Sequence, residues 1–302
     1  MLKSFGKGFA RVTALLAGFA LAACATQTAR APAAGEARPA LWTLSDADTT
    51  IYLFGTIHAL PEGTEWRTPA LDRALAASEE LVTEIRLADE MAAAGAFARL
   101  GLTTGLPPAL ERVPEGKRAL MREALAGIGL PLAAADRMKS WALAVTLAQV
   151  LFQRAGIDPQ LGVERRLTAD FTARGRTMSG LETIEAQLGF LDSLPEADQR
   201  VFLEGVLESP EEVRRQFDAM VAAWRAGDTR AIARTFNDEE TLTPALREIL
   251  LVRRNARWAE WLQNRLARPG TIFVAVGAGH LAGDDSVQNM LRRRGLATRR
   301  VQ

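Results

Sequence analysis

Two apolar runs rich in β-branched and aromatic residues constrain the fold more than any other feature of the sequence. Thr50–Phe54 lies near the start of the body of the chain, and Thr271–Val276 lies near its end. Between about Ala88 and Leu266 most of the chain has helical spacing, interrupted by Pro and Gly. The pattern predicts an α/β fold with α+β character. Strands from both ends should form a mixed β-sheet core, and helices should fill a large middle region.

Further elements are predicted around these two runs. Leu41–Leu44 should pair with the first run across a polar turn, as a hairpin. Short strands are predicted at Glu80–Ile85, Thr177–Ser179 and Ala297–Val301. Helices are predicted at Thr68–Ala77, at Ser140–Phe152 (buried and too short to span a membrane), at Arg253–Leu266, and at Ser286–Arg294 with Asp284 or Asp285 as its cap and Gly295 after its end.

The first residues have the layout of an export signal. Three basic residues precede an apolar stretch that is too short for a stable membrane anchor, and the stretch ends in Leu21-Ala22-Ala23-Cys24. This segment resembles a lipobox, so Cys24 is the predicted lipidation site, and Ala25 favours sorting to the periplasmic face of the outer membrane. The alternative is an ordinary signal peptide with a chance cysteine. The expected organisation is a signal peptide over residues 1–23, a flexible tether over 24–39 and one domain over 40–302.

Composition and charge exclude several classes of protein. The single cysteine leaves no intrachain disulfide and no Cys-based zinc site. Removing residues 1–23 removes three positive charges, so the net charge of +1 becomes +1 − 3 = −2. A near-neutral body without a basic stripe argues against a nucleic-acid partner. No oligomeric state is predicted.

A glycine pattern near the end of the chain has to be distinguished from a nucleotide site. Gly277-x-Gly279-x-x-Ala282 matches a dinucleotide fingerprint between a strand and a helix. A dinucleotide-binding fold needs a further strand and an acidic residue about 20 positions later. In this sequence that position would fall at the end of the chain or beyond it. No nucleotide cofactor is therefore expected.

The only two histidines share one local pattern. Each lies three residues after a glycine at the end of a predicted strand, as Gly55-Thr56-Ile57-His58 and Gly277-Ala278-Gly279-His280. Glycine is expected to let the backbone leave the strand with φ values that other residues avoid. Both imidazoles should then face the crevice beyond the carboxyl ends of the strands. Such a pair can bind a divalent metal together with a carboxylate, or one ring can act as general base while the other orients substrate.

Glu84 is the best candidate for that carboxylate. It ends a short apolar strand that is expected to lie beside the His58 strand, and a buried glutamate is costly without a partner. The alternative is a carboxylate that points into solvent.

Four further residues are weaker candidates. Arg254 and Asn255 could clamp a substrate carboxylate or hydrogen-bond a ligand. Glu164 and Glu182 both follow glycine-containing turns and could join the site or pair with Arg254. For each of the four, an ordinary structural role is the competing interpretation.

Several short segments, in this order and spacing, together resemble the TraB/GumN family over roughly residues 40–301. They are Tyr52–His58, Glu84, Gly162-Val163-Glu164, Gly180-Leu181-Glu182-Thr183, Arg254-Asn255 and Val276–Leu281. The family is related to the Tiki metalloproteases, and more distantly to erythromycin-esterase-like and ChaN-like proteins. Tiki proteins carry two Gly-x-x-His motifs and a glutamate, and they need a divalent cation. The resemblance therefore implies that His58, Glu84 and His280 are catalytic residues and metal ligands.

The hypothesis from the sequence is a metal-dependent, peptidase-like hydrolase of the cell envelope. Manganese, cobalt and zinc are all chemically suitable, and the Tiki resemblance favours the first two. One alternative is a non-catalytic, lipid-anchored protein that binds a peptide or small molecule in the same crevice. Another is a metal-free, esterase-like hydrolase with a histidine base.

Overall fold

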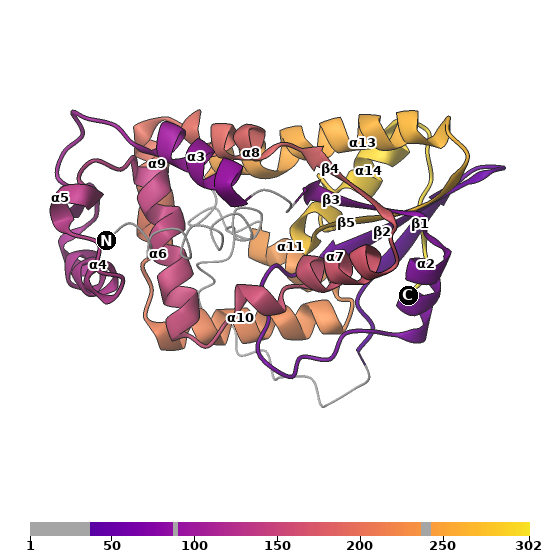
Figure 1. Ribbon diagram of the computed structural model, residues 1–302, viewed down its shortest axis with the longest axis horizontal. Coiled ribbons are helices and arrows are strands. Elements are labelled where there is room, and N and C mark those ends of the chain that lie inside the picture. Colours follow the sequence, from indigo (N-terminus) through magenta and orange to yellow (C-terminus); the bar gives the residue numbers. More distant parts are fainter. Residues whose placement is uncertain (1–36, 87–89, 237–242) are drawn as a thin grey trace.

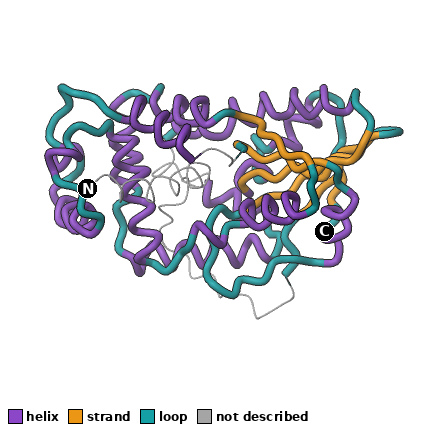
Figure 2. The backbone as a smooth tube through the Cα atoms, in the orientation of Figure 1, coloured by secondary structure: helices purple, strands orange, loops and turns teal. Residues whose placement is uncertain are grey.

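The computed structural model describes residues 37–86, 90–236 and 243–302, with the strands gathered at one end and helices filling the other (Figures 1 and 2). The strands are β1 (Leu41–Ser45), β2 (Thr49–Thr56), β3 (Glu80–Ile85), β4 (Thr177–Glu182), β5 (Gly270–Gly277) and β6 (Arg299–Arg300). The helices are α2 (Pro69–Ala77), α3 (Glu90–Gly101), α4 (Glu115–Gly127), α5 (Leu132–Ala135), α6 (Ser140–Arg154), α7 (Val163–Ala173), α8 (Ile184–Asp192), α9 (Glu196–Gly205), α10 (Pro210–Arg225), α11 (Thr229–Phe236), α12 (Pro244–Arg247), α13 (Arg253–Leu266) and α14 (Val287–Arg293). Short 3-10 turns are η1 (Ala109–Arg112), η2 (Pro159–Leu161) and η4 (Ala278–Leu281), and η3 (Glu248–Val252) is a π-helical turn.

The sheet has six strands in the order β4-β3-β5-β2-β1-β6. The first four are mutually parallel, while β1 runs antiparallel to β2 and to β6. The predicted α/β fold with a mixed sheet and a large helical region is confirmed. Parallel strands end at a common edge, so the carboxyl ends of β2, β3, β4 and β5 lie along one side of the sheet.

One predicted neighbour relation is wrong. The strand of Glu84, β3, does not lie beside β2, because β5 lies between them. The reason is the composition of β5, in which Ile272–Val276 is buried throughout. A strand that is apolar on both faces belongs in the centre of a parallel sheet, with helices above and below it.

Helices cover both faces of the sheet (Figure 1). On one face, Trp258 and Leu262 of α13 and Leu291 of α14 pack with the side chains of β1, β2 and β5. On the other face, α2 and α7 pack against the sheet, and this second core continues into the helical region around α6 and α9. The carboxyl edge of the parallel strands adjoins both cores, because Ile57 and Ala278 belong to the larger core and Val276 and Leu281 to the smaller one.

Most predicted elements are present, with differences at the ends. The predicted helix after Asp284 and Asp285 is capped by Ser286 instead, whose hydroxyl accepts from Asn289 N at 3.4 Å. A serine hydroxyl next to the first turn reaches the free N–H groups directly. The final strand is only Arg299–Arg300, where it pairs with β1.

The predicted signal peptide, Cys24 and most of the predicted tether lie outside the described residues. Residues 37–39, the end of the predicted tether, lie against the body, where Arg38 N donates to Arg225 O at 2.6 Å. Within the described ranges, no helix has the length and apolar character needed to span a membrane.

Candidate functional site

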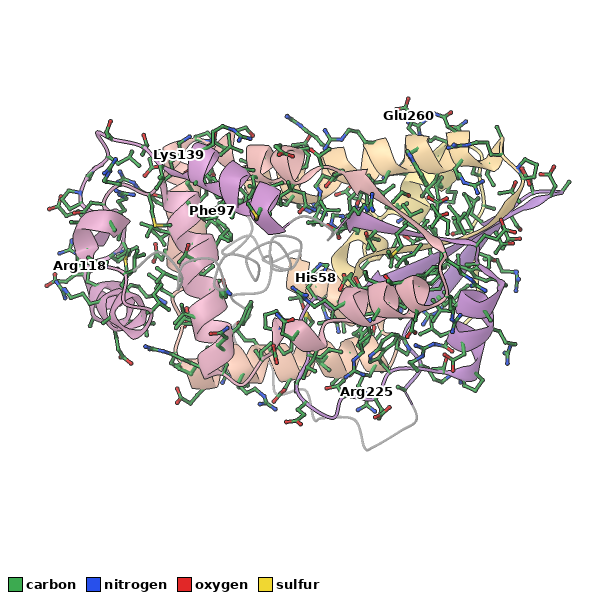
Figure 3. The ribbon with its side chains drawn as sticks, viewed as in Figure 1. His58, Phe97, Arg118, Lys139, Arg225 and Glu260 are labelled. Atoms are coloured by element: carbon green, nitrogen blue, oxygen red, sulfur yellow. The ribbon has the colours of Figure 1, made fainter. Side chains whose placement is uncertain are left out.

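All seven candidate side chains of the body lie in one cluster at the carboxyl edge of the sheet. His58 follows β2, Glu84 lies at the end of β3, Glu182 ends β4, and His280 lies in η4 directly after β5. The remaining three come from helices that begin at the same edge: Glu164 from α7, and Arg254 and Asn255 from α13. Figure 3 shows His58 at the end of the strands that faces the helical region.

Glu84 is the centre of the cluster and only 4% exposed. Its Oε1 accepts from the backbone N–H of Gly277 at 2.7 Å. Its Oε2 accepts from Arg254 Nη2 at 2.5 Å and from Gln187 Nε2 at 3.1 Å. The Nε2 atoms of His58 and His280 lie 4.0 and 3.7 Å from Oε1. One oxygen of this carboxylate therefore faces both histidines, while the other is held by fixed donors.

His58 is paired with a carboxylate through its other nitrogen. Its Nδ1 contacts Glu164 Oε1, and the hydroxyl of Thr56 donates to the same oxygen. Its Nε2 is buried and has no hydrogen-bond partner among the described residues. Burial lowers the pKa of His58, but the charge and hydrogen bond of Glu164, helped by Glu84, outweigh burial and raise that pKa to about 9. The same ion pair, against the opposing effect of burial, lowers the pKa of Glu164.

His280 has an amide where His58 has a carboxylate. Asn255 Nδ2 donates to Asp285 O at 2.8 Å, so its Oδ1 faces His280 Nδ1 at 2.6 Å. Because Nδ1 carries the proton in this arrangement, Nε2 accepts from Arg254 Nη1 at 3.2 Å. Burial, the Arg254 charge and His58 lower the pKa of His280 well below its ordinary value. This ring is therefore neutral.

Arg254 connects the carboxylates. Its Nε donates to both oxygens of Glu182 at 3.1 Å, and its Nη1 also donates to Leu250 O in the π-helical turn at 3.2 Å. The guanidinium lies over the ring of Trp258 at 4.8 Å, and the Trp258 Nε1–H donates to Glu182 at 3.1 Å. Of the two roles predicted for the glutamates, Glu182 pairs with Arg254, whereas Glu164 pairs with His58 instead.

Gly55 and Gly162 serve close packing, and the positive φ predicted for the glycines of the two His motifs is wrong. Gly55, Gly277 and Gly279 are absent from the described glycines with positive φ, and Gly277 has φ −51°. A Cβ on Gly55 would meet Ala278 Cα at 3.0 Å, so the two His turns touch each other there. A Cβ on Gly162 would overlap the carbonyl of His58. Small residues therefore let the turns and α7 approach closely.

Three further residues contact the candidate site but were not predicted from the sequence: Thr56, Gln187 and Trp258. Thr56 lies within the first motif, two residues before His58, and this spacing only weakly indicates that the two side chains lie in the same site. Trp258 lies one helical turn after Arg254, which predicts a shared face. Gln187 in α8 carried no signal, because its contact with Glu84 depends on the order of the strands.

The donor types of the cluster suit a divalent ion, but the two distances from the histidines to Glu84 are too long for one. Within the described ranges, no group of three or more His, Cys, Asp or Glu side chains has the arrangement of a metal site. The two Nε2 atoms lie 3.7 and 4.0 Å from Glu84 Oε1, whereas ligands about 2.1 Å from a tetrahedral ion are about 3.4 Å apart. A small inward movement would close that gap. Arg254 Nη1, which occupies the lone pair of His280 Nε2, would have to release it.

Comparison with known proteins identifies the family of the chain. The pattern of the TraB/PrgY/gumN family matches residues 40–300, and the chain belongs to that family. Similar proteins include the uncharacterized protein YbaP of Escherichia coli, 24% identical over 254 residues, or 84% of this chain and 92% of that protein. YbaP of Shigella flexneri is 25% identical over 80% of this chain and 87% of its own length. An uncharacterized protein of Treponema pallidum is 26% identical, and that match spans about half of each protein (53% of this chain and 52% of the other). No solved structure matches the chain.

Proposed function

We propose that the protein is a divalent-metal-dependent hydrolase of peptide bonds, with His58, Glu84 and His280 as the metal ligands. One observation carries the proposal. Both histidines use Nδ1 to bind a fixed oxygen, on Glu164 and on Asn255, so both Nε2 atoms face the same oxygen of Glu84. Proteins orient histidine ligands in this way, through a hydrogen bond to the nitrogen that does not bind the metal.

The charge balance of the cluster supports a cation. Glu84, Glu164 and Glu182 are three buried carboxylates, and Arg254 is the buried guanidinium that contacts two of them. Arg257 is 3.7 Å from Glu182, but it is 53% exposed, so solvent screens it. Before His58 is counted, two negative charges therefore remain, and in a buried site they attract either a proton, as the raised pKa of His58 indicates, or a divalent cation in place of that proton.

The residues around the proposed metal ligands would then position those ligands. Glu164 and Asn255 hold the two imidazoles in position, and Arg254 fixes Glu84. A bound ion would supply Lewis acidity toward a scissile carbonyl and lower the pKa of a water molecule. In the overall reaction, the water oxygen adds to the carbonyl carbon, the C–N bond breaks, and the departing amine takes a proton.

The test compares metal content in the purified full-length protein with that of His58→Ala and His280→Ala. We expect wild type to retain nearly one equivalent of manganese, cobalt or zinc, and each variant to lose most of it. Equal, negligible metal in all three proteins would overturn the metal-dependent version. Incubation with a diverse peptide pool, followed by mass spectrometry, then separates cleavage from simple binding.

A metal-free hydrolase is the second candidate, favoured by the Glu164–His58 pair beside the neutral His280. When the surroundings move the pKa values of two groups apart, one group is suited to act as an acid and the other as a base. With a pKa of about 9, His58 would be the acid at neutral pH. Activity that survives a chelator would support this version.

The first residues of the chain support a separate proposal about the cellular location of the protein. Supported by the lipobox-like segment before Cys24, we propose an outer-membrane lipoprotein whose site lies in the periplasm. Labelled palmitate should enter wild type but not Cys24→Ala, and membrane fractionation should place wild type in the outer membrane. Equal labelling of both proteins contradicts this assignment.

A further inference from the structure

All the N–H groups of the Arg254 guanidinium have acceptors within the protein. The group carries five N–H donors in a fixed fork. Nε donates to Glu182, Nη1 donates to Leu250 O at 3.2 Å, and Nη2 contacts Glu84 Oε2 at 2.5 Å and Glu182 Oε2 at 2.9 Å. The second N–H of Nη1 is directed to His280 Nε2, at 3.2 Å. Arg254 therefore contacts two of the three proposed metal ligands.

Only one of these two contacts conflicts with a bound ion. Arg254 meets Glu84 at Oε2, whereas the Nε2 atoms of both histidines face Oε1. Glu84 can therefore keep its contact with Arg254 while Oε1 binds a cation. His280 has no second acceptor atom, because its Nδ1 donates to Asn255 Oδ1 and Nε2 carries the only lone pair of the ring. A metal ion and Arg254 Nη1 cannot share that lone pair.

Release of His280 would leave the guanidinium well held. Glu182 keeps its contacts with Nε, Leu250 O keeps one N–H of Nη1, and the ring of Trp258 lies 4.8 Å from the guanidinium carbon. Leu250 lies in the π-helical turn η3, directly before α13, and such turns recur at functional sites. Displacement of Arg254 from His280 therefore removes one hydrogen bond and leaves the rest of the cluster in place.

We propose that Arg254 is a built-in competitor of the divalent ion: its Nη1 holds the lone pair of His280, and an ion binds only by displacing it. The inference rests on the proposed metal-dependent function and names what regulates the filling of that site. Like charges repel strongly in a buried site, so the guanidinium also opposes the ion through its charge. Arg254 thereby raises the concentration of free metal at which the site fills.

A purely structural Arg254 leads to the opposite expectation. If the guanidinium only held Glu84 in place for the ion, its removal would weaken metal binding. Two other donors remain on Glu84 in such a variant, because Gly277 N donates to Oε1 at 2.7 Å and Gln187 Nε2 donates to Oε2 at 3.1 Å. The direction of the change in metal affinity therefore distinguishes competition from positioning.

The experiment measures the dissociation constants of manganese, cobalt and zinc by calorimetry, with each ion added alone as its chloride to chelator-treated, full-length protein. Arg254→Met removes both the charge and the donor, so it should bind the ions at least about tenfold more tightly than wild type, the effect of losing one hydrogen bond from a charged group. Arg254→Lys keeps a charge for Glu84 and Glu182 and should fold even if Arg254→Met does not. Its ammonium lacks the fork that also reaches His280, so it should bind at least about threefold more tightly.

Arg257→Met is the matched control. Arg257 lies on the same helix, and its Nη2 is 3.7 Å from Glu182, but its side chain is 53% exposed and screened by solvent. Its loss should change the dissociation constants by less than about threefold. Urea unfolding of each variant checks that it is folded.

Unchanged or weaker binding in both Arg254 variants would overturn the inference and leave the proposed function intact, because wild type would still bind the ion. Tighter binding in Arg254→Met beside wild-type affinity in Arg254→Lys would also overturn it, since the charge alone, and not the contact with His280, would then oppose the ion. Absence of binding in wild type and in both variants would instead overturn the proposed metal dependence itself.

Discussion

The two Gly-x-x-His turns share a spacing, an edge of the sheet and a mutual contact, but the pKa values of their histidines are shifted in opposite directions. His58 is backed by the carboxylate of Glu164, which raises its pKa to about 9. His280 is backed by the amide of Asn255 and faces Arg254, so its pKa lies well below the ordinary value. The turn therefore determines where a histidine lies, and its partners determine what charge it carries.

Replacing Arg254, the cation that Glu84 and Glu182 share, should change the two histidine turns more than any other substitution. Arg254→Met leaves Glu84 and Glu182 buried without their cation, and the loss of one partner from a buried ion pair costs about 3–5 kcal/mol. The same change removes a positive charge from His280 and should raise its pKa. Urea unfolding at neutral pH measures the stability, and NMR titration measures the pKa.

Arg257→Met is the matched control for this change. Arg257 lies on the same helix but is 53% exposed, so its loss should cost less than about 1 kcal/mol. If the two variants are equally stable, Arg254 does not act as the buried counter-ion.

A pH series should separate the two histidines in chelator-treated protein. His58 has a folded pKa of about 9 and an ordinary value of 6.5, so its contribution is fully present below pH 6.5 and is lost as the pH rises through 9. The decline amounts to about 3 kcal/mol in the free energy of unfolding. His280 has the opposite sign: its contribution is present above pH 6.5 and falls below it, because only the unfolded chain then takes the proton.

Glu164→Gln should remove the alkaline part of that series. Without the carboxylate, burial dominates, and the pKa of His58 should fall below 6.5. Stability would then be nearly constant between pH 7 and 9. A slope as steep as that of wild type means that another group titrates in this range.

The sequence predicted where each candidate side chain lies more accurately than it predicted which residues that side chain contacts. The apolar runs identified the strands, and the Gly-x-x-His pattern located both turns, because these features depend on local spacing. The placement of Glu84 beside β2 failed, since strand order depends on how β5 is covered on both faces. The different charge states of His58 and His280 could not be predicted from the sequence either. They arise from contacts between residues more than 20 positions apart, such as His280 with Asn255.

Giving His280 an acidic partner would make the two turns more alike. Asn255→Asp replaces the amide oxygen with a carboxylate and should raise the pKa of His280 toward that of His58. The variant also loses the donor to Asp285 O, which should cost about 1–2 kcal/mol. An unchanged pKa in NMR titration would show that Arg254, and not Asn255, keeps His280 neutral.

Thr56→Val should have the smallest effect, and it tests how the charged turn is supported. The Thr56 hydroxyl donates to the Glu164 oxygen that pairs with His58, and this bond helps to lower the pKa of Glu164. Valine keeps the shape and removes the donor, so we expect a loss of about 1 kcal/mol in urea unfolding and a higher pKa for Glu164. Thr146→Val is the control, because the Thr146 hydroxyl donates only to Ala142 O within α6 and its loss should cost less. Equal losses in the two variants would mean that the Thr56 hydroxyl adds nothing specific to the charged pair, and Glu164 alone would then account for the difference between the two histidines.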